Sequence, residues 1–335
     1  MRCEAGGGAF VRRCLNWLSG TQLAGAALAL VLVAGAAPGG WGPAPAARAR
    51  LTAVTSTTIL ADLVRRVAGE RWDVKAIVPV GADPHAYQAT PGDARRLASA
   101  DLVVLVGAGL ETPAFEKLVR SAAKAATVLK VAPALGVVRD GEGTVEAGSP
   151  GDEHGHGGEV DPHVWWSVPL TIRLVEEVEA ALERVDPEGA PVYRTNLQGY
   201  THELQRLDGW IREQVAAIPP GRRLLATNHG VLGYFAREYG FRVVGEVLPG
   251  TSSLAEASAA DTARLVTRLK QLRVPAIFAE TTVSPVLAAR VSREAGVRLV
   301  TLYTDSLGPE GSGAETYVGF MKTNVGRIVE ALRGG

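Results

Sequence analysis

The stretch DPEGAPVYRTNLQGYTHELQRLDGWIREQVAAIP, residues 186–219, decides how the chain is organised. From Tyr193 to Ile211 its apolar residues recur at alternating spacings of four and three, and no helix breaker follows until Pro219. About thirty helical residues at ~1.5 Å each would span roughly 45 Å, enough to run along two domains. We therefore predict a rigid linking helix over 186–218. A plain long core helix would show the same periodicity but would leave the repeated layout around it unexplained.

Two similar series flank this helix, and in both of them short β-branched runs alternate with amphipathic helical stretches. The first series predicts strands at 51–55, 74–79, 102–106 and 127–131, and helices at 59–68, 91–98, 112–123 and 168–185. The second predicts strands at 223–227, 242–248, 276–279 and 298–303, and helices at 231–239, 259–271, 285–295 and 315–332. The sequence thus predicts an α/β fold with two lobes, 50–185 and 219–335, each built on a parallel-rich sheet.

Residues 1–49 have the form of a signal peptide. Three arginines precede an apolar run from Leu23 to Ala37, and Ala47-Arg48-Ala49 has the small-x-small form of a cleavage site. An uncleaved anchor is the alternative. Both cysteines, Cys3 and Cys14, precede the apolar run, whereas a lipoprotein needs a cysteine just after it. We expect export to the periplasm or another extracytoplasmic space without a lipid anchor.

The charge of the mature chain excludes one class of partner. Residues 1–49 hold four of the 35 basic and one of the 35 acidic residues, which leaves 31 against 34 and a formal charge of −3. This balance gives no support for nucleic-acid binding.

We expect the protein to be a monomer.

The tripeptide Asp-Pro-His occurs twice, at 83–85 and 161–163, and holds two of the six histidines. Proline fixes its own φ and makes the preceding residue extended, while Asp hydrogen-bonds nearby backbone, so such a turn aims the next side chain. An imidazole aimed from a rigid loop suits a divalent metal. Two ordinary turns carrying surface histidines are the alternative.

Two further candidates lie where parallel sheets bind their ligands, at the carboxyl ends of strands. His229 directly follows the first strand of the second series, and Asp305 directly follows the last. Two candidates per lobe would meet in the cleft. His229 and Asp305 are also typical of helix caps or turns. Glu280 is a competing carboxylate that we expect beside the site more than in it, and His202 should be solvated on the linking helix.

These residues resemble those of the zinc and manganese substrate-binding proteins of bacterial ABC transporters, the cluster A-I or cluster 9 group. The matching segments, in order through nearly all of the mature chain, are Gly81-Ala82-Asp83-Pro84-His85-Ala86-Tyr87, Asp161-Pro162-His163-Val164-Trp165, Asn228-His229-Gly230 with Tyr234-Phe235-Ala236, Phe278-Ala279-Glu280, and Thr304-Asp305-Ser306-Leu307 with Asn324. The resemblance implies two (β/α)4-type lobes, one buried metal between them, an ABC permease in the inner membrane as partner, and no enzymatic activity. Carried over, the metal ligands are His85, His163, His229 and Asp305.

The expected cargo is Zn²⁺, with Mn²⁺ as the alternative. Three imidazoles and a carboxylate make a nitrogen-rich, potentially tetrahedral set, whereas Mn²⁺ prefers more oxygen. In the resembling family, zinc-type members usually have a histidine at the position of His229 and manganese-type members a glutamate. Many zinc members also carry a long His-rich loop, which is shortened here to 152–156 with His154 and His156. An auxiliary zinc-collecting role and a plain surface loop both remain open.

Two other functions compete with metal capture. A secreted zinc hydrolase needs an open coordination position for water, which a fourth protein ligand would close, and the sequence has no His-Glu-x-x-His motif. An organic-solute binding protein or adhesin of the same architecture would not be stabilised by metal. For metal capture, a rigid linking helix should restrict hinge closure, so we expect release through local movement of the ligand loops.

Overall fold

The computed structural model of the chain describes residues 50–137 and 160–334. Its strands are β1 (Leu51–Thr55), β2 (Trp72–Ala76), β3 (Leu102–Leu105), β4 (Thr127–Lys130), β5 (Leu224–Thr227), β6 (Arg242–Glu246), β7 (Ala276–Glu280) and β8 (Arg298–Leu302). Its α-helices are α1 (Thr58–Ala68), α2 (Pro91–Ala98), α3 (Pro113–Ala122), α4 (Val131–Ala134), α5 (Val168–Val185), α6 (Ala190–Ala216), α7 (Gly233–Tyr239), α8 (Ala259–Leu272), α9 (Val286–Ala295) and α10 (Tyr317–Leu332).

The strands form two four-stranded sheets, and every pairing in them is parallel. The strand orders are β2-β1-β3-β4 and β6-β5-β7-β8, so the two sheets share one topology. In each sheet the second strand in the chain pairs on one side of the first strand, and the third strand pairs on its other side. This reversal creates a topological switch point, where open α/β sheets bind ligands at the carboxyl ends of their strands. The predicted α/β fold with two parallel sheets and a long helix is confirmed.

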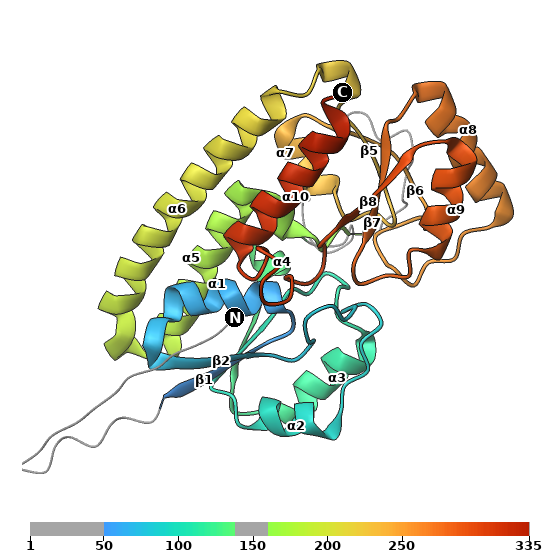
Figure 1. Cartoon of the computed structure of the whole chain (residues 1–335). Coiled ribbons are helices and arrows are strands. Elements are labelled where there is room, and N and C mark those ends of the chain that lie inside the picture. Colours follow the sequence, from blue (N-terminus) through green and yellow to red (C-terminus); the bar gives the residue numbers. More distant parts are fainter. Residues whose placement is uncertain (1–49, 138–159, 335) are drawn as a thin grey trace, which may run out of the picture. The chain divides into compact units, whose positions relative to one another are not determined.

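Side chains of each sheet alternate between two cores, as the period of a strand requires. Within β3, Leu102 and Val104 enter the central core, while Val103 and Leu105 pack with residues of α2 and α3 on the outer face. The strand β7 divides its side chains in the same way, and its outer face packs against α8 and α9. Figure 1 shows these helix pairs at the far side of each sheet from α6.

The inner faces of both sheets belong to one continuous core. The helix α6 packs against α1 and α5 beside the first sheet and against α7 and α10 towards the second (Figure 1). Its buried residues Leu204, Leu207 and Ile211 lie in the same cluster as Leu102 of β3 and Phe278 of β7. The predicted linking helix is therefore a core element of both halves, which makes a large rotation of one half against the other costly.

The helix α6 begins at Ala190, so the predicted start at Asp186 was four residues early. Pro187–Gly189 form a separate 3-10 turn instead. The Asp186 carboxylate accepts a hydrogen bond from Tyr193 Oη at 2.6 Å, and a Cβ on Gly189 would lie 2.3 Å from that oxygen. The carboxylate thus ties the turn to the first turns of the helix. With 27 residues, α6 spans about 40 Å.

Other predicted boundaries were wrong by a few residues. The second strand covers Trp72–Ala76 and not 74–79, because the chain turns away from the sheet after Val78. The helices α7 and α10 each start two residues later than predicted. Among the described residues, no helix combines the length and the apolar character needed to cross a membrane.

Candidate metal centre

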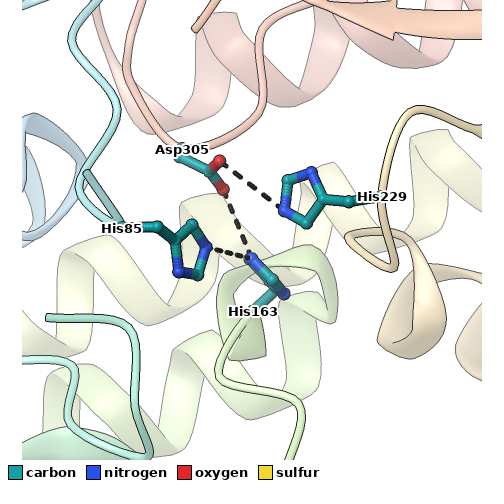
Figure 2. Close-up of side chains that lie close together, drawn as sticks. All are labelled: His85, His163, His229 and Asp305. Carbon is teal, nitrogen blue, oxygen red and sulfur yellow. Dashed lines mark hydrogen bonds and ion pairs between the residues drawn. The ribbon is translucent and has the colours of Figure 1, made fainter. Parts of the chain in front are cut away.

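The structure brings together all four predicted site residues (Figure 2). The distances are 3.4 Å from His85 Nε2 to His163 Nε2, 3.5 Å from His163 Nε2 to Asp305 Oδ1, and 4.0 Å from His229 Nε2 to Asp305 Oδ2. A tetrahedral metal with bonds of about 2.1 Å has ligand atoms about 3.4 Å apart. The spacing of the four side chains therefore fits a single small cation.

Each of the four side chains is placed by the end of an element. His229 lies two residues after β5, and Asp305 three residues after β8. His85 lies in the segment between β2 and α2, and His163 directly precedes a 3-10 turn at Val164–Trp166 that leads into α5. The two sheets thus present their carboxyl ends to a common point. The helix-cap alternative for His229 was wrong, because the cap of α7 is Leu232.

Both Asp-Pro-His turns aim their histidine through the same contact. Asp83 Oδ1 accepts a hydrogen bond from the backbone nitrogen of His85, and Asp161 Oδ1 accepts one from that of His163, each at 2.9 Å. In both turns the aspartate fixes the backbone of the histidine two residues on. The alternative of two surface turns was wrong, since both imidazoles are buried.

Carboxylates also hold two of the imidazole rings. Asp161 Oδ1 lies 2.8 Å from His163 Nδ1, and Glu280 Oε1 lies 2.7 Å from His229 Nδ1. A carboxylate only accepts, so each Nδ1 carries a proton and each Nε2 faces the centre, where it can coordinate a metal once it is unprotonated. Glu280 therefore lies behind His229 and not among the four, as expected. The ring contact of Asp161 was missed, although its position two residues before His163 signalled it.

Burial and the charge of Glu280 shift the pKa values of the histidines in opposite directions. Loss of water lowers the pKa of His85 to about 2, with the neighbouring His163 and His229 acting in the same direction. Burial also holds the pKa of His163 well below its ordinary value. Burial opposes protonation of His229 as well, but the charge of Glu280 and its hydrogen bond outweigh it and raise the pKa to about 9. Burial raises the pKa of Asp305 well above its usual range.

The central atoms of the site have no protein partner to hydrogen-bond. Both carboxylate oxygens of Asp305 and Nε2 of His229 are buried without a hydrogen-bond partner among the described residues. A buried charge without a partner costs several kcal/mol unless a counter-charge or a metal satisfies it. Three imidazole lone pairs and a carboxylate around one point form a donor set that fits a divalent transition metal.

Comparison with known proteins agrees with this geometry. Residues 53–331 match the family model of the zinc-uptake complex component A, periplasmic (ZnuA). The chain belongs to this family. Its members are metal-binding substrate-binding proteins of ABC transporters, so the family resemblance seen in the sequence is confirmed.

The names of similar proteins include both manganese and zinc. The chain is 36% identical over 283 residues to the manganese-binding lipoprotein MntA of Halalkalibacterium halodurans, covering 84% of this chain and 88% of that one. It is 31% identical over 288 residues to the manganese ABC transporter substrate-binding lipoprotein PsaA of Streptococcus pneumoniae, covering 84% of this chain and 89% of that one. The structure of the periplasmic zinc-binding protein TroA from Treponema pallidum matches with a TM-score of 0.75 at 31% identity, covering 84% and 99%.

The remaining sequence predictions do not concern the metal centre. His202 is exposed on α6, as expected. His154 and His156, and the signal peptide at 1–49, lie outside the described residues. The MntA and PsaA relatives are named lipoproteins, whereas we expected this chain to carry no lipid anchor.

Proposed function

We propose that His85, His163, His229 and Asp305 bind one divalent metal ion, and that the protein delivers this ion to an ABC permease outside the cytoplasm. The observation that carries the proposal is the pair of buried, unpartnered Asp305 oxygens facing three imidazole nitrogens. Four protein donors close the coordination sphere, so the arrangement supports capture and release and not hydrolysis. We further propose that the chain divides into a first lobe at 50–185, a linking segment at 186–218 and a second lobe at 219–335.

The donor set favours Zn²⁺, and the named relatives favour Mn²⁺. Three nitrogens and one carboxylate suit zinc, while manganese prefers more oxygen donors. This preference rests on His229, since a glutamate there would make the set half oxygen. Two of the three relatives compared above carry manganese in their names, and that supports the alternative more than the zinc assignment. Zinc binds nitrogen sites more tightly than manganese whichever metal is the cargo, so affinity and physiological cargo need separate tests.

Metal-dependent melting tests capture. Protein stripped with a chelator should regain stability with Zn²⁺ or Mn²⁺, by about 2.7 kcal/mol at one hundred times the dissociation constant. His163→Ala should remove this gain, because it deletes a buried donor of the centre. His202→Ala is the matched control, since His202 is an exposed histidine on α6. A metal response that survives in His163→Ala would overturn the assignment of the site.

Two further experiments separate zinc from manganese. Changing His229 to Glu should lower the ratio of zinc to manganese affinity at least about tenfold, because an oxygen replaces a nitrogen donor. Uptake of radioactive zinc and manganese by cells with and without the protein identifies the cargo. The zinc proposal predicts that only zinc uptake falls. Loss of manganese uptake alone would support the alternative.

A further inference from the structure

The segment that carries His85 has the weakest support of the four. Residues 77–90 form neither helix nor strand between β2 and α2. After Val78 leaves the sheet, two side-chain hydrogen bonds join residues 79–86 to the second half, and His85 Nε2 also lies 3.4 Å from His163 Nε2 of the first half. One joins the Gly81 nitrogen to Ser306 Oγ at 2.9 Å, and the other joins Ser253 Oγ to Asp83 Oδ2.

The bond from Ser253 acts on the carboxylate that aims His85. Asp83 accepts from the His85 backbone with Oδ1 and from Ser253 Oγ with Oδ2, the latter at 2.5 Å. A hydroxyl that donates to a carboxylate at this length makes a charge-assisted bond, about twice as strong as a neutral one. Through Asp83, the position of His85 therefore depends on a residue of the other half.

The second Asp-Pro-His turn is also bonded to the second half, but its aspartate holds the histidine more fully. Asp161 holds both the backbone and the ring of His163, and Tyr234 Oη donates to the Asp161 carbonyl at 3.1 Å. His163 is fully buried, whereas 3% of His85 is exposed, the largest exposed fraction among the four. His85 is thus the candidate ligand nearest to solvent and the one most easily moved.

The segment that carries Ser253 is bonded to the rest of the second half at its start. This segment lies between β6 and α8, and its start is bonded to the residues around His229. The Gly230 nitrogen donates to the Gly250 carbonyl at 2.7 Å, and the Leu248 nitrogen donates to the Asn228 carbonyl at 2.7 Å. A Cβ on Gly230 would lie 2.9 Å from the Gly250 oxygen, so the two segments approach as closely as glycine allows. The start of the segment that carries Ser253 is thus bonded to the strand end that carries His229.

We propose, on the basis of the metal-capture function above, that Ser253 is a positioning residue that latches the His85 segment over the bound ion and sets how fast the ion leaves. When the bond from Ser253 to Asp83 breaks, residues 79–86 keep one side-chain hydrogen bond to the second half, from the Gly81 nitrogen to Ser306 Oγ, and His85 can swing away without rotation of the two halves. Because the shared core makes rotation of the two halves costly, release needs a local loop movement. The bond between Ser253 and Asp83 is where we expect that movement to begin.

Zinc release from the intact protein tests the latch. Zn²⁺-loaded protein is mixed with excess chromophoric chelator, and release is followed by stopped-flow absorbance. Ser253→Ala should release zinc about tenfold faster than wild type, which corresponds to about 1.4 kcal/mol. Ser253→Thr keeps a hydroxyl and should restore slow release. The matched control is Ser252→Ala, because the hydroxyl of the neighbouring Ser252 accepts from the Leu254 nitrogen at 3.3 Å and, among the described residues, makes no hydrogen bond to Asp83.

The outcomes separate the latch from the proposed function. If wild-type protein binds zinc but Ser253→Ala releases it within twofold of the wild-type rate, the latch is wrong and metal capture stands. Equal acceleration in Ser252→Ala also refutes the latch, since the effect would then belong to the whole loop. If wild-type protein binds no metal, the proposed function fails first. Melting of the metal-free variants should stay near wild type, so that a changed rate reports positioning and not unfolding.

Discussion

Replacing Glu280 by Gln should weaken metal binding in a manner that depends on pH. Glu280 is buried, and its Oε1 accepts from both the Nδ1 and the backbone nitrogen of His229, at 2.7 and 3.2 Å. Its Oε2 accepts from Thr304 Oγ1 at 2.8 Å. A glutamine keeps the acceptor towards His229 and can donate to the threonine hydroxyl. The substitution therefore removes a charge and leaves the shape of the site.

Two opposing effects set the magnitude. Loss of a carboxylate partner from a metal-binding histidine costs about 10- to 100-fold in affinity, or about 1.4 to 2.8 kcal/mol. The same carboxylate also raises the pKa of His229 to about 9, so in wild type a proton competes with the metal. Below pH 9 this competition weakens wild-type binding about tenfold per pH unit. The variant escapes most of it, because burial alone lowers the pKa of this imidazole.

The affinities of wild type and Glu280→Gln should therefore converge as pH falls. Competition with a chromophoric chelator at pH 8.5 should show the variant binding Zn²⁺ about 10- to 100-fold more weakly. At pH 6.5 the gap should be at least about tenfold smaller. An affinity ratio that does not change with pH would refute the proton competition, and an unchanged affinity at pH 8.5 would refute the orienting role of Glu280.

Three further predictions concern the centre and the core. Asp305→Ala should weaken zinc binding more than about 100-fold in the chelator assay. It should not lower the melting temperature of the metal-free protein, because it removes two buried oxygens that lack hydrogen-bond partners. A marked loss of metal-free stability would contradict this. At pH 7 zinc binding should release at least about one proton, since the raised pKa keeps His229 protonated until metal displaces the proton and the raised pKa of Asp305 acts in the same direction. Titration calorimetry in buffers of different ionisation enthalpy measures this, and zero release would refute it. Leu204→Ala in α6 should cost about 2 to 5 kcal/mol and lower a single unfolding transition of both halves, whereas two separate transitions would argue against the shared core.

Much of the fold follows from periodicity in the sequence. Strand residues alternate with period two and helices with period 3.6, so the type and order of most elements were predictable. The start of α6 was not, because it depends on how Asp186 closes a turn against Tyr193. The shared core was also not predictable, since the same apolar stripe on α6 suits one lobe or both.

The four site residues were predictable because each follows a strand end or a rigid turn. Their supporting contacts were harder to find. Glu280 was expected near the centre from its place at the end of β7, but its bond to the His229 ring depends on how β5 and β7 pair. Ser253 gave no signal at all, since 170 residues separate it from Asp83 and serine is common in loops.

The most direct test of the metal centre is a crystal structure of the protein loaded with Zn²⁺, with the metal located by anomalous scattering. We predict a single ion bonded at about 2.0 to 2.2 Å to Nε2 of His85, His163 and His229 and to the carboxylate of Asp305. An ion bound elsewhere, or these four side chains left without metal at saturating zinc, would contradict the proposed function.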